Sequence, residues 1–306
     1  MKTVFVTGAN GFIGTALVKE LIARGADVTA MVREEKESSR TIRELGAKIV
    51  LCDLKNLNLL PEKTQGKVFD TFYHLAWNGS AGSDRTNSRL QLDNAQYAVD
   101  AVHVAAAMGC KRFIGAGSIM EYETNTAANA QGNKLGMPYI YGAGKLAAHV
   151  MSKAAAADVG IEHIWPMITN AYGPGEVSPR FVNMTLRKMI HKEPLQFTAA
   201  TQNYDFIYID DVARAFYLVG EKGKAFFQYI VGSGSARPLK EFISEMQQAL
   251  APDQSLLFGD VPFTGINLGL EYFSTNPILT DTGFSPEVDF VEGTRRTMEW
   301  LKEVEK

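Results

Sequence analysis

A tyrosine and a lysine four residues apart have the spacing and side-chain types of a proton-transfer pair. Tyr141 and Lys145 lie near the start of a helix predicted over residues 139–159, and positions i and i+4 share one face of a helix. A lysine ammonium beside a phenol favours the phenolate and lowers its pKa from about 10 toward neutrality. Such a tyrosine can donate and accept a proton at cellular pH. The alternative is an accidental surface pair.

A serine stands at the end of a neighbouring predicted strand. Ser118 follows the apolar stretch 112–116 and Gly117. Its hydroxyl could hydrogen-bond the substrate oxygen that Tyr141 protonates. The alternative is a serine that caps a turn or a helix.

A strand, a glycine turn and a helix over residues 3–25 must position this chemistry. Gly8 allows a sharp turn, Gly11 leaves room for a phosphate, and Gly14 lets the helix pack closely on the strand. We expect the helix to begin at Gly14, with its free N–H groups and dipole directed at a pyrophosphate. Asn10, Phe12 and Ile13 complete the turn. The alternative is a glycine turn with a structural role only.

Strands and helices alternate along the first half of the chain, which predicts an α/β fold with a doubly wound parallel (Rossmann) sheet. We expect a dinucleotide-binding domain over residues 1–166 plus about 203–231, and a smaller substrate-binding lobe over about 167–202 plus 232–306. The predicted strands are 3–7, 27–32, 48–52, 69–75, 112–116 and 161–166, and the predicted helices are 15–24, 33–45, 90–108, 139–159 and 181–191. An apolar segment at 206–208 leads to Asp210 and Asp211.

The composition is that of an ordinary globular protein. The 306 residues are 46% hydrophobic and 21% charged, with a net charge of −3. This balance gives no electrostatic case for nucleic acid or an anionic membrane as the main partner. Cys52 and Cys110 lie far apart and no metal-ligand spacing is present, so we expect no metal and a reducing, cytoplasmic location.

The motifs together resemble the extended short-chain dehydrogenase/reductase family, in particular its nucleotide-sugar epimerases, dehydratases and reductases. The resemblance covers nearly the whole chain. It rests on Thr7–Gly14, Asp53-Leu54, Leu75-Ala76, Asn94, Ser118, Tyr141 with Lys145, Asn170 and the stretch from Tyr204 to Asp211.

The resemblance implies a role for each matched residue. Tyr141 would be the catalytic acid and base, Lys145 would bind the nicotinamide ribose, and Ser118 would hold the reacting oxygen. Asn170 would contact the diphosphate of a nucleotide sugar. Cofactor contacts would come from Asp53 and Leu54 at the adenine, from Leu75, Ala76 and Trp77 along the channel to the nicotinamide, and from Asn94 as a support.

Two departures from the family pattern concern the reaction. Sugar dehydratases of this family follow the active-site Ser or Thr with an Asp-Glu pair, whereas Ile119 and Met120 follow Ser118 here. Neither can transfer a proton, and Glu121 would have to be displaced to substitute. The family's arginine before Asp205 is Tyr204 in this chain, so Arg180 would have to clamp the pyrophosphate. The substrate contacts expected from the resemblance are Ser118, Ile119, Met120, Tyr141, Asn170, Arg180 and Tyr204.

A third departure concerns the cofactor. NAD-binding enzymes usually carry an acidic residue at the end of the second strand, but Val32 is followed by Arg33. An arginine can pair with a 2′-phosphate, which favours NADP over NAD.

The leading hypothesis is an NADP-dependent reductase of a nucleotide 4-keto-6-deoxyhexose. The alternative is an NAD-dependent nucleotide-sugar 4-epimerase of the UDP-glucose/galactose type, and a third hypothesis is a non-catalytic dinucleotide sensor. The outer faces of the helices 90–108 and 139–159 could pair across a two-fold axis. The resemblance therefore also implies a homodimer.

Overall fold

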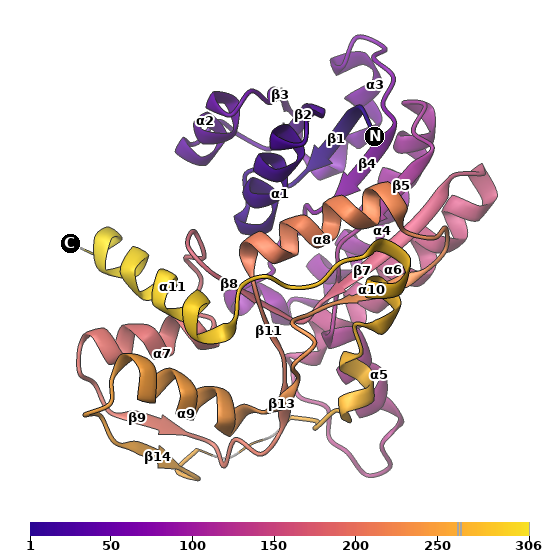
Figure 1. Ribbon diagram of the computed structural model, residues 1–306. Helices are drawn as coiled ribbons and strands as arrows, with labels where there is room; N and C mark the ends of the chain where they lie inside the picture. Colours follow the sequence, from indigo (N-terminus) through magenta and orange to yellow (C-terminus); the bar gives the residue numbers. More distant parts are fainter. Residues whose placement is uncertain (262, 264, 306) are drawn as a thin grey trace.

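A parallel sheet forms the centre of the computed structural model, which describes every residue except Pro262, Thr264 and Lys306. The strand order is β12-β7-β5-β4-β1-β2-β3, and short β6 pairs with β7 (Figure 1). The strands are β1 (Thr3–Thr7), β2 (Asp27–Val32), β3 (Lys48–Leu51), β4 (Thr71–His74), β5 (Arg112–Gly115), β6 (Gly117–Ser118), β7 (Glu162–Ile168) and β12 (Gln228–Val231). The chain runs outward from β1 in one direction and from β4 in the other, which confirms the predicted doubly wound α/β fold.

Two pairs of helices belong to two separate cores of the sheet. Apolar side chains of α1 and α8 share one buried cluster, whereas those of α4 and α6 share a second. The helices and 3₁₀ turns of this part are α1 (Phe12–Ala23), α2 (Glu37–Glu44), η1 (Leu54–Leu59), α3 (Leu60–Lys63), η2 (Gly82–Thr86), α4 (Ser88–Ala107), α5 (Met120–Asn129), α6 (Tyr139–Val159) and α8 (Ile209–Lys222).

Two local features differ from the sequence-based expectations. Helix α1 begins at Phe12 with Gly11 as its N-cap, so the expectation that it begins at Gly14 is wrong. The reason is that Gly14 is needed inside the first helical turn, where it packs against Gly8. Helix α5 was not predicted at all, because its sequence has a weak apolar face and no side-chain N-cap.

The remaining elements gather beside the sheet. Strand β14 pairs with β9, β11 with β8, and β10 with β13, and Figure 1 shows α7, α9 and α11 around the first of these pairs. The bounds are β8 (Asn170–Tyr172), α7 (Phe181–Ile190), β9 (Leu195–Phe197), β10 (Asn203–Tyr204), β11 (Phe206–Tyr208), β13 (Arg237–Pro238), α9 (Leu239–Leu250), β14 (Leu256–Phe258), η3 (Leu270–Phe273), α10 (Asn276–Thr282) and α11 (Phe290–Val304). The predicted division into two lobes stays a prediction.

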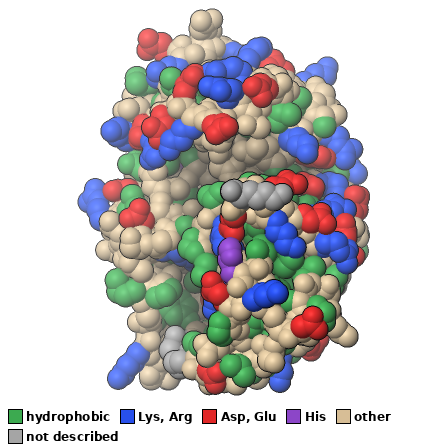
Figure 2. Space-filling view, turned by 90° about the vertical axis from the view of Figure 1, so that its left-hand side faces the viewer, with side chains coloured by type: hydrophobic (Ala, Val, Ile, Leu, Met, Phe, Trp, Pro, Cys, Tyr) green, Lys and Arg blue, Asp and Glu red, His purple; other side chains and the backbone are tan. Residues whose placement is uncertain are grey.

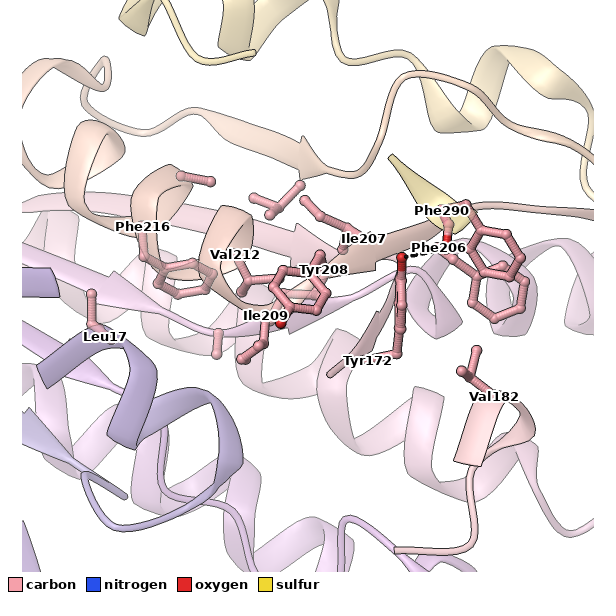
Figure 3. Close-up of a cluster of buried hydrophobic side chains, with 14 of the residues drawn as sticks. Leu17, Tyr172, Val182, Phe206, Ile207, Tyr208, Ile209, Val212, Phe216 and Phe290 are labelled. Carbon is pink, nitrogen blue, oxygen red and sulfur yellow. Dashed lines mark hydrogen bonds between the residues drawn. The ribbon is translucent and has the colours of Figure 1, made fainter. Parts of the chain in front are cut away.

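An aromatic cluster joins these outer elements to the sheet. The Phe206 ring of β11 lies 5.0 Å from Phe242 and 5.3 Å from Phe290, and the Tyr172 hydroxyl donates to the Phe290 carbonyl at 3.3 Å. Figure 3 shows Tyr172, Phe206 and Phe290 together, with Leu17 and Phe216 at the opposite end of the same group of buried side chains. Because all of them are buried in one cluster, the walls of any site between these parts share a continuous support.

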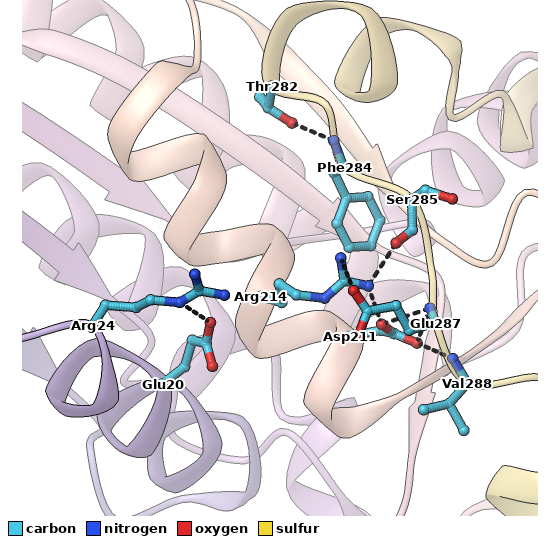
Figure 4. A network of polar contacts seen from close by, with 9 residues as sticks. All are labelled: Glu20, Arg24, Asp211, Arg214, Thr282, Phe284, Ser285, Glu287 and Val288. Atoms are coloured by element: carbon cyan, nitrogen blue, oxygen red, sulfur yellow. Dashed lines mark hydrogen bonds and ion pairs between the residues drawn. The ribbon is translucent and has the colours of Figure 1, made fainter.

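A buried carboxylate fixes the segment that enters α11. Asp211 is only 2% exposed and accepts hydrogen bonds from the backbone N–H groups of Glu287 and Val288, both at 3.0 Å. Arg214 donates to Asp211 and to the Ser285 carbonyl, each at 2.5 Å (Figure 4). The network therefore ties the start of α8 to the chain before α11.

Basic and acidic side chains are intermixed on the surface shown in Figure 2. No described helix is long and apolar enough to cross a membrane. In the same described part of the chain, no three His, Cys, Asp or Glu side chains are grouped as metal ligands would be.

Replacing the buried carboxylate should destabilise the fold far more than replacing its exposed neighbour. Asp211→Ala removes a buried carboxylate that accepts from two part-buried N–H groups and from Arg214, so we expect a loss of about 3 kcal/mol in the free energy of unfolding. The control is Glu287→Gln, because the Glu287 side chain is 72% exposed although it pairs with Arg214; its loss should stay below about 1 kcal/mol. Urea denaturation measures both, and equal midpoints would contradict this role of Asp211.

Candidate functional site

Two adjoining cavities open at the carboxyl ends of the central strands. The larger, of about 670 Å³, runs from the β1–α1 turn past the ends of β2 and β4, and we call it the long cleft. The smaller, of about 290 Å³, lies between β6, α5 and the outer elements, and we call it the inner cavity. Tyr141, Glu176 and Arg180 line both. Tyr141 therefore stands where the two cavities meet.

The glycine turn brings three backbone segments into contact at the floor of the long cleft. Gly8 has φ +66°, and a Cβ there would lie 2.6 Å from the Ala76 nitrogen. A Cβ on Gly14 would lie 2.1 Å from the Gly8 carbonyl oxygen, whereas one on Gly11 would meet only that oxygen, at 3.3 Å. The first and third glycines are thus required by packing, and the first N–H groups of α1 keep no intrahelical partner. This is the geometry of an anion cradle, lined also by Asn10, Phe12 and Ile13.

Basic and acidic side chains alternate at the far end of the long cleft. Arg33, Glu34 and Lys36 line it after β2; Glu34 lies 3.8 Å from Arg33 and 2.8 Å from Lys36. Asp53 also lines the cleft, but its carboxylate accepts from the Lys55 N–H at 3.1 Å and caps η1. Leu54 lies beside it. Sequence reasoning named Arg33 but not Lys36.

The loop after β4 forms one wall of the long cleft and is held by α4. Leu75, Ala76 and Trp77 line the cleft, and the Trp77 indole donates to the Gln91 side chain at 2.8 Å. Asn94 is buried and does not line it; its amide exchanges hydrogen bonds with the Asn78 backbone at 2.9 and 2.8 Å. Asn94 therefore supports the wall indirectly.

Gln91 ties the same loop together at further points. Its amide donates to the carbonyls of Gly79 and Asp84, at 3.1 and 3.0 Å. The next residue along the chain, Arg85, reaches the inner cavity. One buried side chain thus positions Trp77 for one cavity and Arg85 for the other.

Lys145 is buried, lines the long cleft and makes no hydrogen bond to Tyr141. Its ammonium donates to the Ala116 carbonyl at 2.8 Å and lies 3.7 Å from the Trp77 ring centre and 5.9 Å from that of Tyr141. Burial lowers the pKa of Lys145 to about 7. Tyr141 and Lys145 both lie on α6, as the sequence predicts, but Lys145 is not among the groups that lower the pKa of Tyr141.

The cations that act on the phenol are two arginines. Burial raises the pKa of Tyr141, and Arg85, Arg180 and the Ser118 hydroxyl oppose this shift. The Arg85 guanidinium lies over the Tyr141 ring at 4.1 Å. Sequence reasoning assigned the lowering of this pKa to Lys145; in the structure Arg85 is the leading cation.

Ser118 is fixed from behind by a buried glutamate. The Ser118 N–H donates to Glu121 at 2.9 Å, and the Trp165 indole and His149 ring contact the same carboxylate, each at 2.9 Å. Glu121 is 2% exposed and does not line the inner cavity, whereas Ile119 and Met120 do. The Ser118 hydroxyl, on the cavity side, also accepts from the Met120 N–H at 3.2 Å.

The inner cavity contains residues that sequence reasoning missed, namely Arg85, Glu123 and Glu176. Glu123 lies on the unpredicted helix α5, one turn beyond Ile119 and Met120, and that helical spacing was the available signal. Arg85 comes from a loop whose path no local pattern shows. Burial raises the pKa of Glu123 to about 7, with Arg85 opposing.

The three predicted substrate-binding residues of the outer elements all line the inner cavity. The Asn170 amide donates to the Asp205 carbonyl at 3.0 Å, so its donor is already engaged. Arg180 pairs with Glu176 at 3.1 Å. Burial raises the pKa of Tyr204 to about 12, and its hydroxyl stays neutral at cellular pH.

A family model described as the NAD dependent epimerase/dehydratase family matches residues 4–232, which is most of the chain. The chain belongs to this family. The match contains the glycine turn, Ser118, Tyr141 and Lys145.

Two curated relatives align over nearly the whole chain. One is the trifunctional UDP-glucose 4,6-dehydratase/UDP-4-keto-6-deoxy-D-glucose 3,5-epimerase/UDP-4-keto-L-rhamnose-reductase RHM3 of Arabidopsis thaliana, 23% identical over 99% of this chain and 47% of that protein. The chain therefore spans about half the length of this relative. The other is the CDP-abequose synthase of Salmonella typhimurium, 24% identical over 97% of this chain and 98% of the relative.

Among solved structures, the UDP-N-acetylglucosamine 4-epimerase from Methanobrevibacter ruminantium M1, in complex with UDP-N-acetylmuramic acid, is similar over 99% of each chain. The TM-score is 0.81 and the identity 22%. At this identity the likeness concerns the fold. By their names these relatives act on nucleotide-linked sugars, and the family that this chain belongs to is described as NAD dependent.

Replacing Glu121 by alanine should destabilise the fold, whereas the same substitution at Glu123 should have little effect on stability. Glu121→Ala removes the buried partner of the Ser118 N–H, the Trp165 indole and the His149 ring, so we expect the free energy of unfolding to fall by about 3 kcal/mol. Glu123→Ala, two residues away, removes a carboxylate with no hydrogen-bond partner in the described part of the chain and should change it by less than about 0.5 kcal/mol. Urea denaturation compares the two, and equal losses would contradict this assignment.

Proposed function

We propose that this chain is an NADP-dependent reductase of a nucleotide 4-keto-6-deoxyhexose. The observation that carries the proposal is the position of Tyr141, with Ser118 beside it, where the long cleft meets the inner cavity. A dinucleotide held in the long cleft and a sugar held in the inner cavity would both reach this tyrosine. The fit of the cofactor rests on the cradle at Gly8 and Gly14, which a Cβ would fill.

The residues of the junction would act on the ketone oxygen. A reduced nicotinamide, when bound, supplies the hydride that reaches the sugar carbonyl carbon. Tyr141 donates its proton to the carbonyl oxygen, and Ser118 holds that oxygen by a hydrogen bond. Lys145 holds the nicotinamide ribose, and Arg85 and Arg180 favour the phenolate that remains.

Dehydration is disfavoured by the residues that follow Ser118. Ile119 and Met120 line the inner cavity without a proton-transfer group. Glu121 faces away from it and is held by Ser118, Trp165 and His149. An enzyme that eliminates water needs both a base and an acid at the sugar, and these positions supply neither.

The second candidate is an NAD-dependent nucleotide-sugar 4-epimerase of the UDP-glucose/galactose type. The same three residues, Ser118, Tyr141 and Lys145, could oxidise a sugar hydroxyl and reduce the ketone from its other face. The family's description as NAD dependent favours this candidate. A non-catalytic dinucleotide sensor is a third hypothesis, but it gives no reason for Ser118 and Tyr141 to line one cavity.

The preference for NADP rests on the end of β2. Arg33 and Lys36 both line the long cleft there and could pair with a 2′-phosphate. Glu34 pairs with both of them and partly neutralises their positive charge, so the expected preference for NADP over NAD is modest.

We also propose a cytoplasmic homodimer. Both cysteines are buried and unpaired, as suits a reducing compartment. Leu92 of α4 and Val150 and Met151 of α6 are exposed apolar side chains on two helices that pack against each other. A second copy could cover these faces in a four-helix contact.

The reductase proposal predicts stoichiometric use of reduced cofactor. UDP-, CDP- and dTDP-4-keto-6-deoxyglucose are incubated with NADPH, and we expect absorbance loss at the nicotinamide band with at least one of them. UDP-glucose and UDP-galactose are incubated without added cofactor. If UDP-glucose and UDP-galactose are interconverted and NADPH is consumed with none of the keto-sugars, the reductase proposal is wrong and the epimerase takes its place.

Tyr141→Phe is the variant matched to this assay. It removes the hydroxyl but keeps the ring beneath Arg85, so turnover should fall by about 100-fold or more. Binding of NADPH, followed by its fluorescence, should be retained. Full activity of the variant would refute the proton-transfer role of Tyr141.

The cofactor preference predicts a selective effect of one arginine. Arg33→Ala should weaken NADPH binding by about tenfold, the loss of one charge-assisted hydrogen bond, and leave NADH binding nearly unchanged. Arg40→Ala is the control, since Arg40 is equally charged and exposed but lies outside the cleft. Titration of both variants with both cofactors measures this, and equal losses for NADPH and NADH would contradict the proposed contact.

A further inference from the structure

Helix α5 directs two glutamates to opposite sides. Residues two apart on a helix lie about 200° apart around its axis, so Glu121 and Glu123 cannot share a face. Glu121 is buried behind Ser118. Glu123 lies three and four residues after Met120 and Ile119, and all three line the inner cavity. A carboxylate therefore reaches the cavity one helical turn later than the positions where the family's dehydratases carry theirs.

The Glu123 carboxylate is left free toward the cavity. Within the described residues no hydrogen bond or ion pair of its side chain is present, in contrast to Glu121, which is held by three groups. The side chain is half-buried. Arg85 and Tyr204 line the same cavity, and burial together with the charge of Glu123 raises the pKa of Tyr139 and of Tyr204. A free, half-buried carboxylate in a cleft with cationic and phenolic neighbours is suited to proton transfer.

The inner cavity is small enough for one bound group to touch both of its walls. Ser118, Tyr141, Glu123, Arg85 and Tyr204 all line this space of about 290 Å³, which is at the lower end of small-molecule sites. A ring whose carbonyl oxygen is held by Ser118 and Tyr141 would present its neighbouring carbons to the rest of the lining.

We propose that Glu123 is a second proton-transfer residue of this site, which removes and returns the proton on a carbon next to the sugar ketone held by Ser118 and Tyr141. The proposal rests on the ketone substrate of the proposed function. It adds a reaction that consumes no reduced cofactor.

The step is balanced without an oxidant or a reductant. The C–H bond next to the carbonyl breaks, its proton passes to the Glu123 carboxylate, and its electron pair forms a carbon–carbon double bond as the carbonyl becomes an enolate. Tyr141 and Ser118 hydrogen-bond the enolate oxygen, and the Arg85 charge favours it. The reverse step returns a proton from the Glu123 carboxyl, which has meanwhile exchanged with solvent.

The charge state of Glu123 suits both directions. Burial raises its pKa to about 7, and Arg85 opposes the shift. The groups facing it are Arg85 from η2, Tyr139 from α6 and Tyr204 from β10, and the pKa of each tyrosine is raised by burial, so both phenols stay neutral. Removal of the substrate proton needs the ionised carboxylate, so exchange should rise with pH and level off above about 7.

Solvent exchange tests the proposal. The enzyme, with NADP⁺ added so that the ketone cannot be reduced, is incubated in D₂O with UDP-, CDP- and dTDP-4-keto-6-deoxyglucose, and NMR follows deuterium at the carbons next to the ketone. We expect incorporation faster than without enzyme for at least one probe. No incorporation above the enzyme-free rate in any of the three would overturn the proposal.

Variants separate proton transfer from binding. Glu123→Gln should lower the exchange rate by about 100-fold or more and abolish its rise with pH, but lower NADPH-dependent reduction by less than about tenfold. Glu123→Asp should restore part of the exchange, and Asn125→Ala, an exposed residue of the same helix, should leave it unchanged. Exchange by Glu123→Gln at the wild-type rate would overturn the proposal, and so would equal losses of exchange and reduction, which would mark a binding role.

The exchange and reduction assays fail independently. Exchange without NADPH use would support the role of Glu123 and contradict the reductase function. Reduction without exchange would support the reductase function and contradict the proposed role of Glu123.

Discussion

The close approach of three backbone segments at the end of β1 is the constraint on which the site depends. Gly8, Gly14 and Ala76 meet so tightly that no Cβ fits at either glycine. Because the turn and the loop after β4 share this contact, the start of α1 and the Trp77 wall face each other across one cleft. Trp77 in turn lies under Lys145, so the position of the catalytic helix follows from the same contact.

The pKa values of Tyr141 and Lys145 are set more by their burial than by an interaction between the two side chains. Desolvation raises the pKa of this phenol and lowers that of Lys145, so each group is shifted toward its neutral form. Two arginines, from different elements, oppose the shift at the phenol. A bound diphosphate near Arg180 would weaken that opposition, since it would compensate one of the two charges. The proton affinity of the site thus depends on what occupies both cavities.

The fold class and the ends of most strands of the central sheet could be predicted from the sequence, because glycine turns and apolar periodicity are local properties. The bounds of α6, β1 and β2 were predicted to the residue. Helix α5 was missed, since its sequence is only weakly amphipathic and the helix packs mainly against α6, a contact that no local pattern of its own sequence shows. Glu123 was missed with it. Arg85 and Glu176 were missed because their approach to Tyr141 and Arg180 depends on loop paths, and the actual partner of the Lys145 ammonium could not be read from its spacing.

The Gln91 side chain has a consequence for how this site can diversify. Gln91 is 1% exposed and hydrogen-bonds Trp77, Gly79 and Asp84. A Cβ added at Gly144, next to Lys145, would lie 2.9 Å from the Cβ of Gln91. A larger residue at 144 would displace Gln91, and with it the walls of both cavities. The residues at positions 91 and 144 are therefore expected to change together among homologues. In the loop after β4, substitutions should be tolerated best at residues that Gln91 does not hydrogen-bond. Changes of substrate are more accessible through α5 and the elements beyond β7 than through this loop.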